Sequence, residues 1–394
     1  MLVAGIFVFN VFNYLFHFSM ARMLGPVDYG VLASLMSILY LFSIPSETIQ
    51  TTIAKYTAIF RVKKEDGKIK YLIRKSIGKC LKLGLIATLI FIAISPLIQG
   101  FLKFDSIMPI IALSLVIFPI IISPIVRGAL QGIKRFKALG LNFSLEGVIK
   151  LILAIALVLI GWNVYGPIIA IIIASFITFF IAFYYLKDID NKKERNFSSK
   201  GVFSYSIPVF VALICLTVMY SIDMILAKHF FSEQDAGIYA VASLLGKMIF
   251  FGLSPVAKAM FPVVAERKES KKKYKHLLTK ALSIVVTICA FIVAIYYLFP
   301  QLLISLLFGS EYSAASNLIF YLGIGFSFLT FSYILIFYNL SLGKTKSIFS
   351  LALFAVIEVI LLSIFNSSLL QFCLSFLIIN VITFIFLFIF NRDR

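Results

Sequence analysis

The feature that most constrains this chain is a series of long apolar runs that carry no charged residue. Residues 83–102 and 106–126 contain no Asp, Glu, Lys or Arg, and each is about as long as the roughly 20 residues that a helix needs to cross the hydrocarbon core of a bilayer. Of the 394 residues, 61% are hydrophobic and 13% are charged, which is about half the charged fraction of a soluble domain. Because a water-soluble fold of this size could not bury that much apolar surface, we predict an all-α integral membrane protein.

The apolar segments divide into twelve predicted transmembrane helices. Two of the longest runs are interrupted by turn residues at 163–167 and 366–368, so each is expected to form a helical hairpin. The first segment has no basic leader and no small-residue cleavage site, and we interpret it as a membrane helix rather than a removed signal peptide. The expected spans are residues 2–24, 31–60, 83–101, 107–130, 138–161, 166–186, 202–229, 237–265, 278–299, 314–337, 347–364 and 369–390.

Positive charge is concentrated in alternate loops between these spans. Segments 61–79, 134–137, 187–200 and 267–275 hold eight, three, five and six Lys or Arg residues, whereas the intervening loops hold little more than Lys103. By the positive-inside rule, we expect a multi-pass protein of the cytoplasmic membrane with both termini on the cytoplasmic side. The formal net charge of +19 is then explained by basic cytoplasmic segments that face anionic lipid headgroups. No nucleic-acid partner is expected.

A short internal repeat divides the chain into two halves. The sequence DYGV at 28–31 corresponds to DAGI at 235–238, and each copy links the first two spans of a six-span half. A repeat of six spans preserves orientation in the membrane. We therefore expect 1–190 and 202–394 to form two six-helix lobes related by a pseudo-two-fold axis along the membrane normal, joined by a cytoplasmic linker at 191–201.

Several segments resemble a known transporter family. The sequence ARMLGPVDYG at 21–30 is similar to the signature that follows the first span of polysaccharide repeat-unit flippases of the O-antigen type, which belong to the multidrug/oligosaccharidyl-lipid/polysaccharide (MOP) exporter superfamily. RGALQG at 127–132, SID at 221–223 and AGIY at 236–239 resemble later segments of that family. The resemblance implies a two-lobed flippase with alternating access, whose substrate is an oligosaccharide on a polyprenyl phosphate or pyrophosphate carrier. Membrane lipids and polysaccharide assembly enzymes are its implied partners.

Basic residues inside the predicted spans are the first site candidates, because a charge in the membrane must face a cavity or a partner. A phosphate-linked sugar needs cations in place of water, and the expected substrate-binding residues are Arg22, Lys55, Lys247 and Lys258. Lys247 and Lys258 are about three helical turns apart and should share one face of their helix. For Lys55 and Lys258, the alternative is that both side chains snorkel to cytoplasmic headgroups.

Acidic residues inside the spans are candidates for ion coupling. Glu47 and Asp223 are expected to bind H⁺ or Na⁺, with an ion pair to a lysine as the alternative that the sequence leaves open. Glu146 and Lys150 stand at i, i+4 and either neutralise each other or serve transport. Glu358 is a lone acid in the eleventh span. The three histidines are isolated from one another, so no catalytic group, metal site or cofactor is expected.

The sequence thus predicts a transporter rather than an enzyme, namely a lipid-linked oligosaccharide flippase for polysaccharide or cell-surface glycan biosynthesis. A cation-coupled multidrug extruder of the same superfamily is the nearest alternative. It would favour an acid-dominated cavity, whereas the candidates here are mostly basic. A membrane glycosyltransferase or polysaccharide polymerase is less favoured, because the predicted outer loops are only a few residues long and the cytoplasmic ones are rich in lysine.

Overall fold

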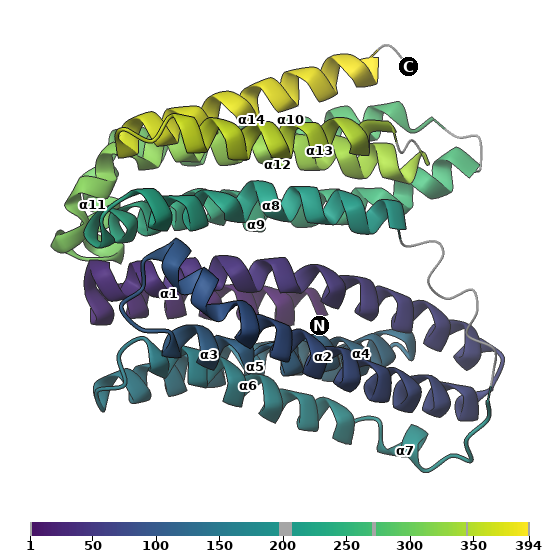
Figure 1. Ribbon diagram of the computed structural model, residues 1–394. Helices are drawn as coiled ribbons and strands as arrows, with labels where there is room; N and C mark the ends of the chain where they lie inside the picture. The colour runs from purple at the N-terminus through teal and green to yellow at the C-terminus, as the bar shows by residue number, and fades with distance from the viewer. Residues whose placement is uncertain (1, 197–206, 270–272, 344–345, 393–394) are drawn as a thin grey trace. The chain divides into compact units, whose positions relative to one another are not determined.

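The protein is helical throughout the part of the chain that can be described. The computed structural model describes residues 2–196, 207–269, 273–343 and 346–392. Within these ranges there is no strand, and the long elements are all α-helices (Figure 1). The all-α prediction is therefore confirmed. The end of the predicted linker (197–201) and the start of the predicted seventh span (202–206) lie outside the described residues.

The chain packs as two compact units. The first is formed by Met1–Leu35 and Phe42–Ile207, and the second by Met36–Leu41 and Pro208–Arg394. The helices that carry most of the first unit are α1 (Leu2–Val62), α2 (Asp66–Leu102), α3 (Met108–Ser114), α4 (Ile117–Gly132), α5 (Phe136–Leu159), α6 (Tyr165–Tyr184) and the short α7 (Lys187–Asp190).

The first helix is two membrane spans joined end to end. Its 61 residues are interrupted at Gly25, whose φ of 73° and ψ of 176° are not helical. Glycine suits this position because a side chain at positive φ would be strained, and Pro26 follows it directly. The helix runs on through Pro45 to Val62. The break thus separates the first two predicted spans.

The basic segment after α1 is largely helical instead of forming a loop. α2 begins at Asp66 and spans 37 residues, or about 55 Å at the α-helical rise, so it extends well beyond the hydrocarbon core of a bilayer. The segment that we predicted as a loop at 61–79 mostly forms the first turns of this helix. Lysine and arginine have good helix propensity, so a charged stretch can continue a membrane helix into the headgroup region.

Two glycines let α4 lie directly against the second half of α1. A Cβ atom added to Gly128 would lie 2.5 Å from the carbonyl oxygen of Gln50, and one added to Gly132 would lie 2.6 Å from that of Ala54. The two glycines are four residues apart, which is the spacing of the GxxxG motif of close helix pairs in membranes. The side-chain amide of Gln50 also donates a 3.1 Å hydrogen bond to Gln131. The segment RGALQG therefore has a clear packing role.

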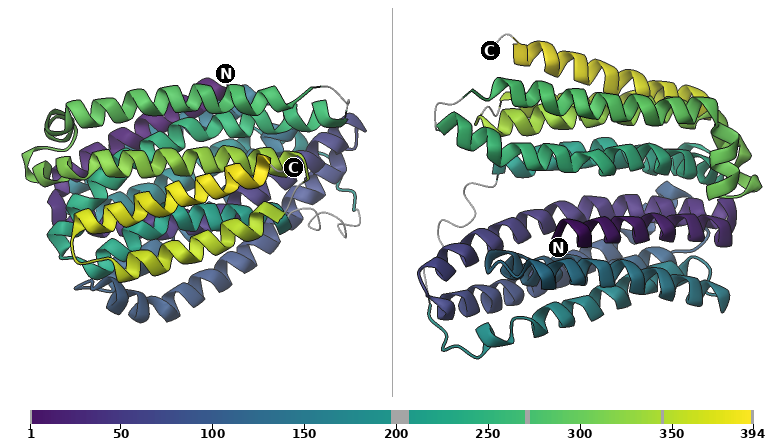
Figure 2. Two further views of the ribbon diagram at one scale, coloured as in Figure 1. Left: turned by 90° about the horizontal axis from the view of Figure 1, so that it is seen from above. Right: turned by 180° about the vertical axis from the view of Figure 1, so that it is seen from behind.

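The second unit is organised around α12. Its elements are α8 (Ile207–Phe230), α9 (Glu233–Glu269), α10 (Lys275–Leu298), α11 (Pro300–Leu307), the 3₁₀ helix η2 (Ser310–Asn317), α12 (Ile319–Ser341), α13 (Lys346–Ile364) and α14 (Leu369–Arg392). α12 packs against α9, α10 and α14 (Figure 2). The elements α11 and η2 fill the connection between the ninth and tenth predicted spans, where the sequence did not indicate a helix.

One phenylalanine fixes α12 between two neighbours. The ring of Phe326 lies 4.7 Å from that of Phe376 in α14, measured between centroids. On its other side the ring fills the space where Gly246 of α9 lacks a Cβ. Both Phe326 and Phe376 are fully buried. This packing places the residue after Gly246, which is Lys247, in the interior of the second unit.

The number of membrane helices agrees with the prediction. Ten helices in the described ranges are long and apolar enough to cross a membrane. One of them is α1, which Gly25 divides into two spans, and α13 adds a shorter apolar stretch at Ser350–Ile364. The total is therefore twelve. The turns predicted at 163–167 and 366–368 separate α5 from α6 and α13 from α14.

Candidate functional site

A buried ion pair lies at the centre of a polar cluster in the second unit. Asp223 of α8 has none of its surface exposed, and the Lys247 side chain is 6% exposed. The Nζ of Lys247 lies 3.1 Å from Oδ1 of Asp223. The lysine ammonium also lies 5.9 Å from the centre of the Phe326 ring. The structure thus brings together one predicted substrate-binding residue and one predicted ion-coupling residue.

The other carboxylate oxygen of Asp223 accepts two hydroxyl hydrogen bonds. Ser243 donates to Oδ2 at 2.6 Å, and Tyr239 donates to the same atom at 3.1 Å. Tyr239, Ser243 and Lys247 are spaced four residues apart on α9. At 3.6 residues per turn, this spacing puts all three on one face of the helix, towards Asp223. One helix therefore supplies all three side-chain donors that hold the carboxylate.

The structure shows Asp223 in the ion pair with a lysine that the sequence offered as one of its two alternatives. Taking a carboxylate and an ammonium out of water costs on the order of several kcal/mol for each ion, and their attraction offsets this only with good geometry and further hydrogen bonds. The hydroxyls of Tyr239 and Ser243 supply those bonds. Asp223 is therefore an acid in an ion pair with a lysine, in an apolar surrounding where loss of one partner leaves the other uncompensated.

A second acid is buried next to this pair. Glu358 of α13 is completely buried, and neither of its carboxyl oxygens has a hydrogen-bond partner in the described residues. It interacts electrostatically with Asp223 and with Tyr239. Buried polar groups are nearly always hydrogen-bonded, and one that is not calls for an explanation. The sequence offered Glu358 only as an isolated acid, and the structure makes it a member of the Asp223 cluster.

The charges of this cluster do not balance. When all are ionised, Asp223 and Glu358 contribute two negative charges and Lys247 contributes one positive charge. An uncompensated carboxylate is very costly in an apolar interior. One proton or one small cation would restore neutrality. In the described residues, no group of three or more His, Cys, Asp or Glu side chains is placed to hold a metal ion.

The first unit holds a polar cluster of its own, centred on Arg127 of α4. Its guanidinium forms a salt bridge with Glu146 of α5 and donates to the Asn142 side chain at 2.8 Å. Asn142 in turn donates to the carbonyl oxygen of Thr178 in α6 at 2.6 Å. Ser175 donates to the second oxygen of Glu146 at 3.3 Å. The cluster thus ties α4, α5 and α6 together through groups that satisfy one another.

Lys150 does not form the salt bridge with Glu146 that its spacing suggested. Its ammonium donates to the side-chain oxygen of Asn13 in α1. It also lies 4.5 Å from the centre of the Phe16 ring and 5.7 Å from that of Phe9. Aromatic faces attract cations. The partner of Glu146 is a residue of another helix, which spacing along one helix could not indicate.

The other four predicted site residues have different surroundings from the Asp223 pair. Arg22, Glu47 and Lys55 are exposed side chains of α1. Lys258 lies on α9, eleven residues beyond Lys247, and is also exposed. Lys247 and Lys258 therefore share a helix but differ in burial. An exposed charge at the flank of an apolar helix can reach a headgroup or a transported anion.

Sequence reasoning missed Tyr239 and Ser243, although a signal for both was present. The i, i+4, i+8 spacing of a tyrosine, a serine and a lysine on an otherwise apolar helix is a polar stripe. Such a stripe inside a membrane helix must face a partner. The sequence-based prediction pairs Lys247 with Lys258, whereas the stripe of Tyr239, Ser243 and Lys247 indicates a buried acid opposite all three residues.

The sequence matches a described protein family over most of its length. Residues 19–317 match the family described as polysaccharide biosynthesis protein. A membrane protein of Methanocaldococcus jannaschii, described as uncharacterized, is 26% identical over 277 residues, which is 65% of this chain. The chain spans 64% of that relative's length, which is less than two thirds.

Solved structures of transporters share the fold. A multidrug-resistance MATE-family transporter of the MOP superfamily, in an inward-facing conformation, superimposes with a TM-score of 0.82 at 16% identity, over 97% of this chain and 93% of its own. A MOP-superfamily transporter from Pyrococcus furiosus superimposes with a TM-score of 0.69 at 18% identity, over 100% and 93% of the two chains. The description of that transporter states that the reversed polarity of its binding pocket suggests a different function. At these identities the likeness establishes the fold.

Proposed function

The chain belongs to the family of polysaccharide biosynthesis proteins, and we propose that it is a flippase that moves an oligosaccharide linked to polyprenyl phosphate or pyrophosphate across the cytoplasmic membrane. The family and the transporter fold support a membrane transporter. The lipid-linked glycan as its substrate is our inference. The observation that carries it is the buried pair of Lys247 and Asp223, because it supplies a cation for a phosphate together with an acid that can release that cation.

The proposed cycle exchanges the partner of Lys247. In the observed state its ammonium is held by Asp223. If Asp223 accepts a proton, or the cluster takes up a small cation, the pair weakens and the ammonium becomes available to the substrate phosphate. When the ion leaves, Asp223 recovers Lys247 and the phosphate is released. A ligand shifts an equilibrium between two states only by the difference in its affinity for them. For the substrate phosphate, that difference comes from the Lys247 ammonium, which is available in one state and held by Asp223 in the other.

Glu358 gives the cluster its capacity for an ion. It is buried without a hydrogen-bond partner in the described part of the chain, and it interacts electrostatically with Asp223. A proton bound by either of the two carboxyls would neutralise the excess charge without a further side chain. We propose Asp223 and Glu358 together as the ion-coupling groups, with H⁺ as the first candidate and Na⁺ as the second. Glu47, an exposed acid of α1, is the proposed ion-coupling residue of the first unit.

Exposed cations on the apolar helices of each unit are further proposed contacts for the anionic part of the substrate. Arg22 and Lys55 on α1 and Lys258 on α9 are exposed, so a phosphate or a headgroup can reach each of them. Exposed cations bind weakly because water competes with the anion. Weak binding suits a transporter, which must release its substrate on the far side.

We also propose the orientation of the chain in the cytoplasmic membrane. The basic segment at 267–275 begins in the last turn of α9 in the second unit, and the one at 61–79 begins in the last turn of α1 in the first. By the positive-inside rule, the ends of α1 and α9 that carry these basic segments face the cytoplasm. We therefore propose that both chain termini are also on the cytoplasmic side. Polysaccharide assembly enzymes and anionic lipids are the proposed neighbours of these segments.

A cation-coupled multidrug extruder is the second candidate. The observation that favours it is the acid cluster itself, because Asp223 and Glu358 outnumber Lys247 and would attract an organic cation. The structural likeness to a multidrug-resistance transporter is compatible with this alternative. The two candidates differ in the charge of the substrate, which a transport assay measures directly.

Reconstitution into liposomes tests the proposal. The purified protein is inserted into vesicles that contain a fluorescent polyprenyl-pyrophosphate oligosaccharide, and the fraction in each leaflet is followed with a membrane-impermeant reagent. Native protein should exchange the lipid between leaflets, and Lys247→Ala should not. The matched control is Lys280→Ala, which removes an exposed lysine of α10 and should leave exchange unchanged.

Each outcome separates the candidates. Exchange by the native protein that is lost in Lys247→Ala supports the flippase and the role of the cation. Undiminished exchange by Lys247→Ala at equal protein level would remove that role. Absence of exchange, together with ion-driven efflux of an organic cation such as ethidium, would establish the extruder instead.

A further inference from the structure

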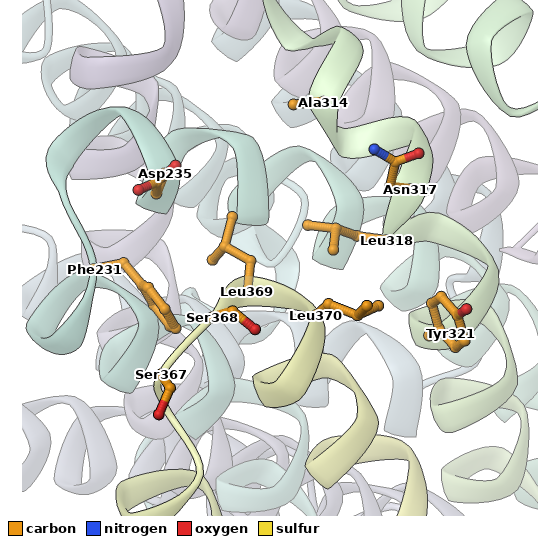
Figure 3. Close-up of a pocket in the computed structure, with 10 residues that line it drawn as sticks. All are labelled: Phe231, Asp235, Ala314, Asn317, Leu318, Tyr321, Ser367, Ser368, Leu369 and Leu370. Atoms are coloured by element: carbon orange, nitrogen blue, oxygen red, sulfur yellow. The ribbon is translucent and has the colours of Figure 1, made fainter.

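The second unit contains a pocket that the proposed phosphate chemistry does not use. It has a volume of about 700 Å³, within the range of small-molecule sites. Residues from four segments surround it (Figure 3): the turn after α8, the first turn of α9, the junction of η2 with α12, and the turn between α13 and α14. This is the end of the second unit away from the basic segment at 267–275.

The polar lining of the pocket can both donate and accept hydrogen bonds. It contains the carboxylate of Asp235, the amide of Asn317 and the hydroxyls of Tyr321, Ser367 and Ser368. Amides and hydroxyls act in both directions, and a carboxylate accepts at two oxygens. A sugar presents a matching surface, since each of its hydroxyls donates one hydrogen bond and accepts others. The apolar face of a sugar ring also packs well on an aromatic ring such as that of Tyr321.

The charge of the lining excludes the phosphate part of the substrate. Among the described residues that line the pocket there is no Lys, Arg or His, and the charged one is the acid Asp235. An anionic phosphate would meet repulsion there, and an acyl chain would leave the polar groups without partners. A neutral or cationic ligand with many hydroxyls is the class that fits both the charge and the hydrogen-bonding groups.

Hydrogen bonds within the first turn of α9 hold Asp235 in a fixed position. The hydroxyl of Ser232 accepts from the backbone amide of Asp235 at 3.1 Å and donates to Oδ2 of the same residue at 2.8 Å. The other carboxylate oxygen, Oδ1, makes no hydrogen bond within the described ranges. One oxygen of Asp235 is therefore occupied, and the other is available to a ligand in a fixed orientation.

A single aromatic ring links the pocket to the Asp223 cluster. The ring of Phe231, which lines the pocket, lies 5.4 Å from that of Phe372. Phe372 lies 5.3 Å from the ring of Tyr239, which donates to Asp223. The pocket and the ion pair are therefore neighbours, separated by the Phe372 layer. A glycan whose phosphate approaches Lys247 would have sugars within reach of this end of the second unit.

We propose that the pocket at the start of α9 and α14 binds a sugar of the transported glycan. Asp235 and Asn317 form hydrogen bonds with its hydroxyls, and Tyr321 packs against its ring. The proposal rests on the flippase function for the identity of the ligand. Its test measures binding alone, so that failure of the pocket and failure of the transport function can be told apart.

Cysteine protection provides that test. The four native cysteines are buried, so a thiol introduced by Ser367→Cys in the lining is the accessible one. The purified protein is labelled with a polar maleimide while increasing amounts of oligosaccharide are added. This oligosaccharide is released by mild acid from the lipid-linked substrate and carries no phosphate. Ser363→Cys, an exposed position outside the lining, is the matched control.

The oligosaccharide should slow the labelling of Ser367→Cys and leave that of Ser363→Cys unchanged. Inorganic pyrophosphate and glycerol at matched concentration should protect neither position. Adding Asp235→Asn should raise the concentration for half protection about tenfold, as expected for the loss of a hydrogen bond to a charged group. Gln234→Ala, at an exposed position outside the lining, should not change it.

Two results would overturn the proposal. One is labelling of Ser367→Cys that stays unchanged up to the solubility of the oligosaccharide while the same protein flips the intact lipid. The other is equal protection by glycerol or pyrophosphate, which would make the pocket a nonspecific solvent-filled site. Protection by the oligosaccharide in a protein that does not flip lipid would keep the pocket and remove the transport function.

Discussion

The ammonium of Lys247 lies 3.1 Å from a carboxylate oxygen of Asp223, and both side chains are buried between apolar helices. Ser243 and Tyr239 complete the coordination of the acid. The two hydroxyls supply the further hydrogen bonds that a buried carboxylate needs beside its counter-ion. The arrangement also places an acid and a cation on adjacent helices, α8 and α9. A change in the charge of either side chain therefore weakens the pair and frees the other side chain.

Breaking this pair should destabilise the protein more than removing it. In Lys247→Ala the carboxylate of Asp223 remains buried without its counter-ion, and a loss of about 3–5 kcal/mol in the free energy of unfolding is expected. The double variant Asp223→Asn with Lys247→Met removes both charges and should recover most of that loss. Thermal unfolding in detergent, followed by size-exclusion chromatography with fluorescence detection, measures both variants.

Stability and transport should separate in the double variant. It should unfold near the temperature of the native protein and should not flip lipid, because no cation remains to be exchanged. A double variant as unstable as Lys247→Ala would contradict the assignment of the cost to an unpaired charge. A double variant that transports at the native rate would contradict the partner-exchange cycle.

Close packing between α1 and α4 predicts a different kind of sensitivity. Gly128→Ala would place its new methyl group 2.5 Å from the carbonyl oxygen of Gln50, and such overpacking should cost about 1–3 kcal/mol of stability. Gly78→Ala in α2 is the matched control, since a Cβ there would meet nothing within 4 Å. It should be neutral, or stabilising by up to about 1 kcal/mol because alanine is the better helix former. Thermal unfolding measures both variants, and equal unfolding temperatures for Gly128→Ala and Gly78→Ala would contradict this reasoning.

The membrane helices could be predicted because each depends on local composition. An uncharged run such as 83–102 has few alternatives to a membrane helix, and turn residues at 163–167 are recognisable without a structure. The boundaries of α2 were less accurate, because lysine and arginine continue a helix as readily as they form a loop. The helix α11 was missed because its eight residues are too few to give a periodic signal.

The side-chain partners could not be predicted, because they depend on how helices rotate against each other. Glu146 has Lys150 four residues away on its own helix, yet its salt bridge is to Arg127 of α4. Asp223 and Lys247 are 24 residues apart, and no pattern within either helix indicates the other. Glu358 could be recognised as an acid in a membrane span, but its closeness to Asp223 arises only from the packing of the second unit.

The orientation of the chain can be checked with introduced cysteines. Lys137→Cys and Lys273→Cys lie at exposed positions on the side that we propose to be cytoplasmic, and Asp105→Cys and Ser363→Cys lie at exposed positions on the opposite side. A membrane-impermeant maleimide added to intact cells should label the last two and should label the first two only after lysis. The unmodified chain is the control, because its four cysteines are buried. The reverse pattern would invert the proposed topology.

The buried acid Glu358 makes the most specific prediction about coupling. Glu358→Gln removes a carboxyl group that has no hydrogen-bond partner in the described residues while keeping its size, so the variant should unfold no more readily than the native protein. If Glu358 takes part in binding the coupling proton, the rate at which the native protein flips lipid should fall when the proton gradient across the liposome is collapsed, and the rate of the variant should not respond. Glu311→Gln, which changes an exposed acid of η2, should respond as the native protein does.

A Glu358→Gln protein that keeps the full response to the proton gradient would exclude this residue from proton coupling. A response to a sodium gradient that is lost in the same variant would identify Na⁺ as the coupling ion of the cluster.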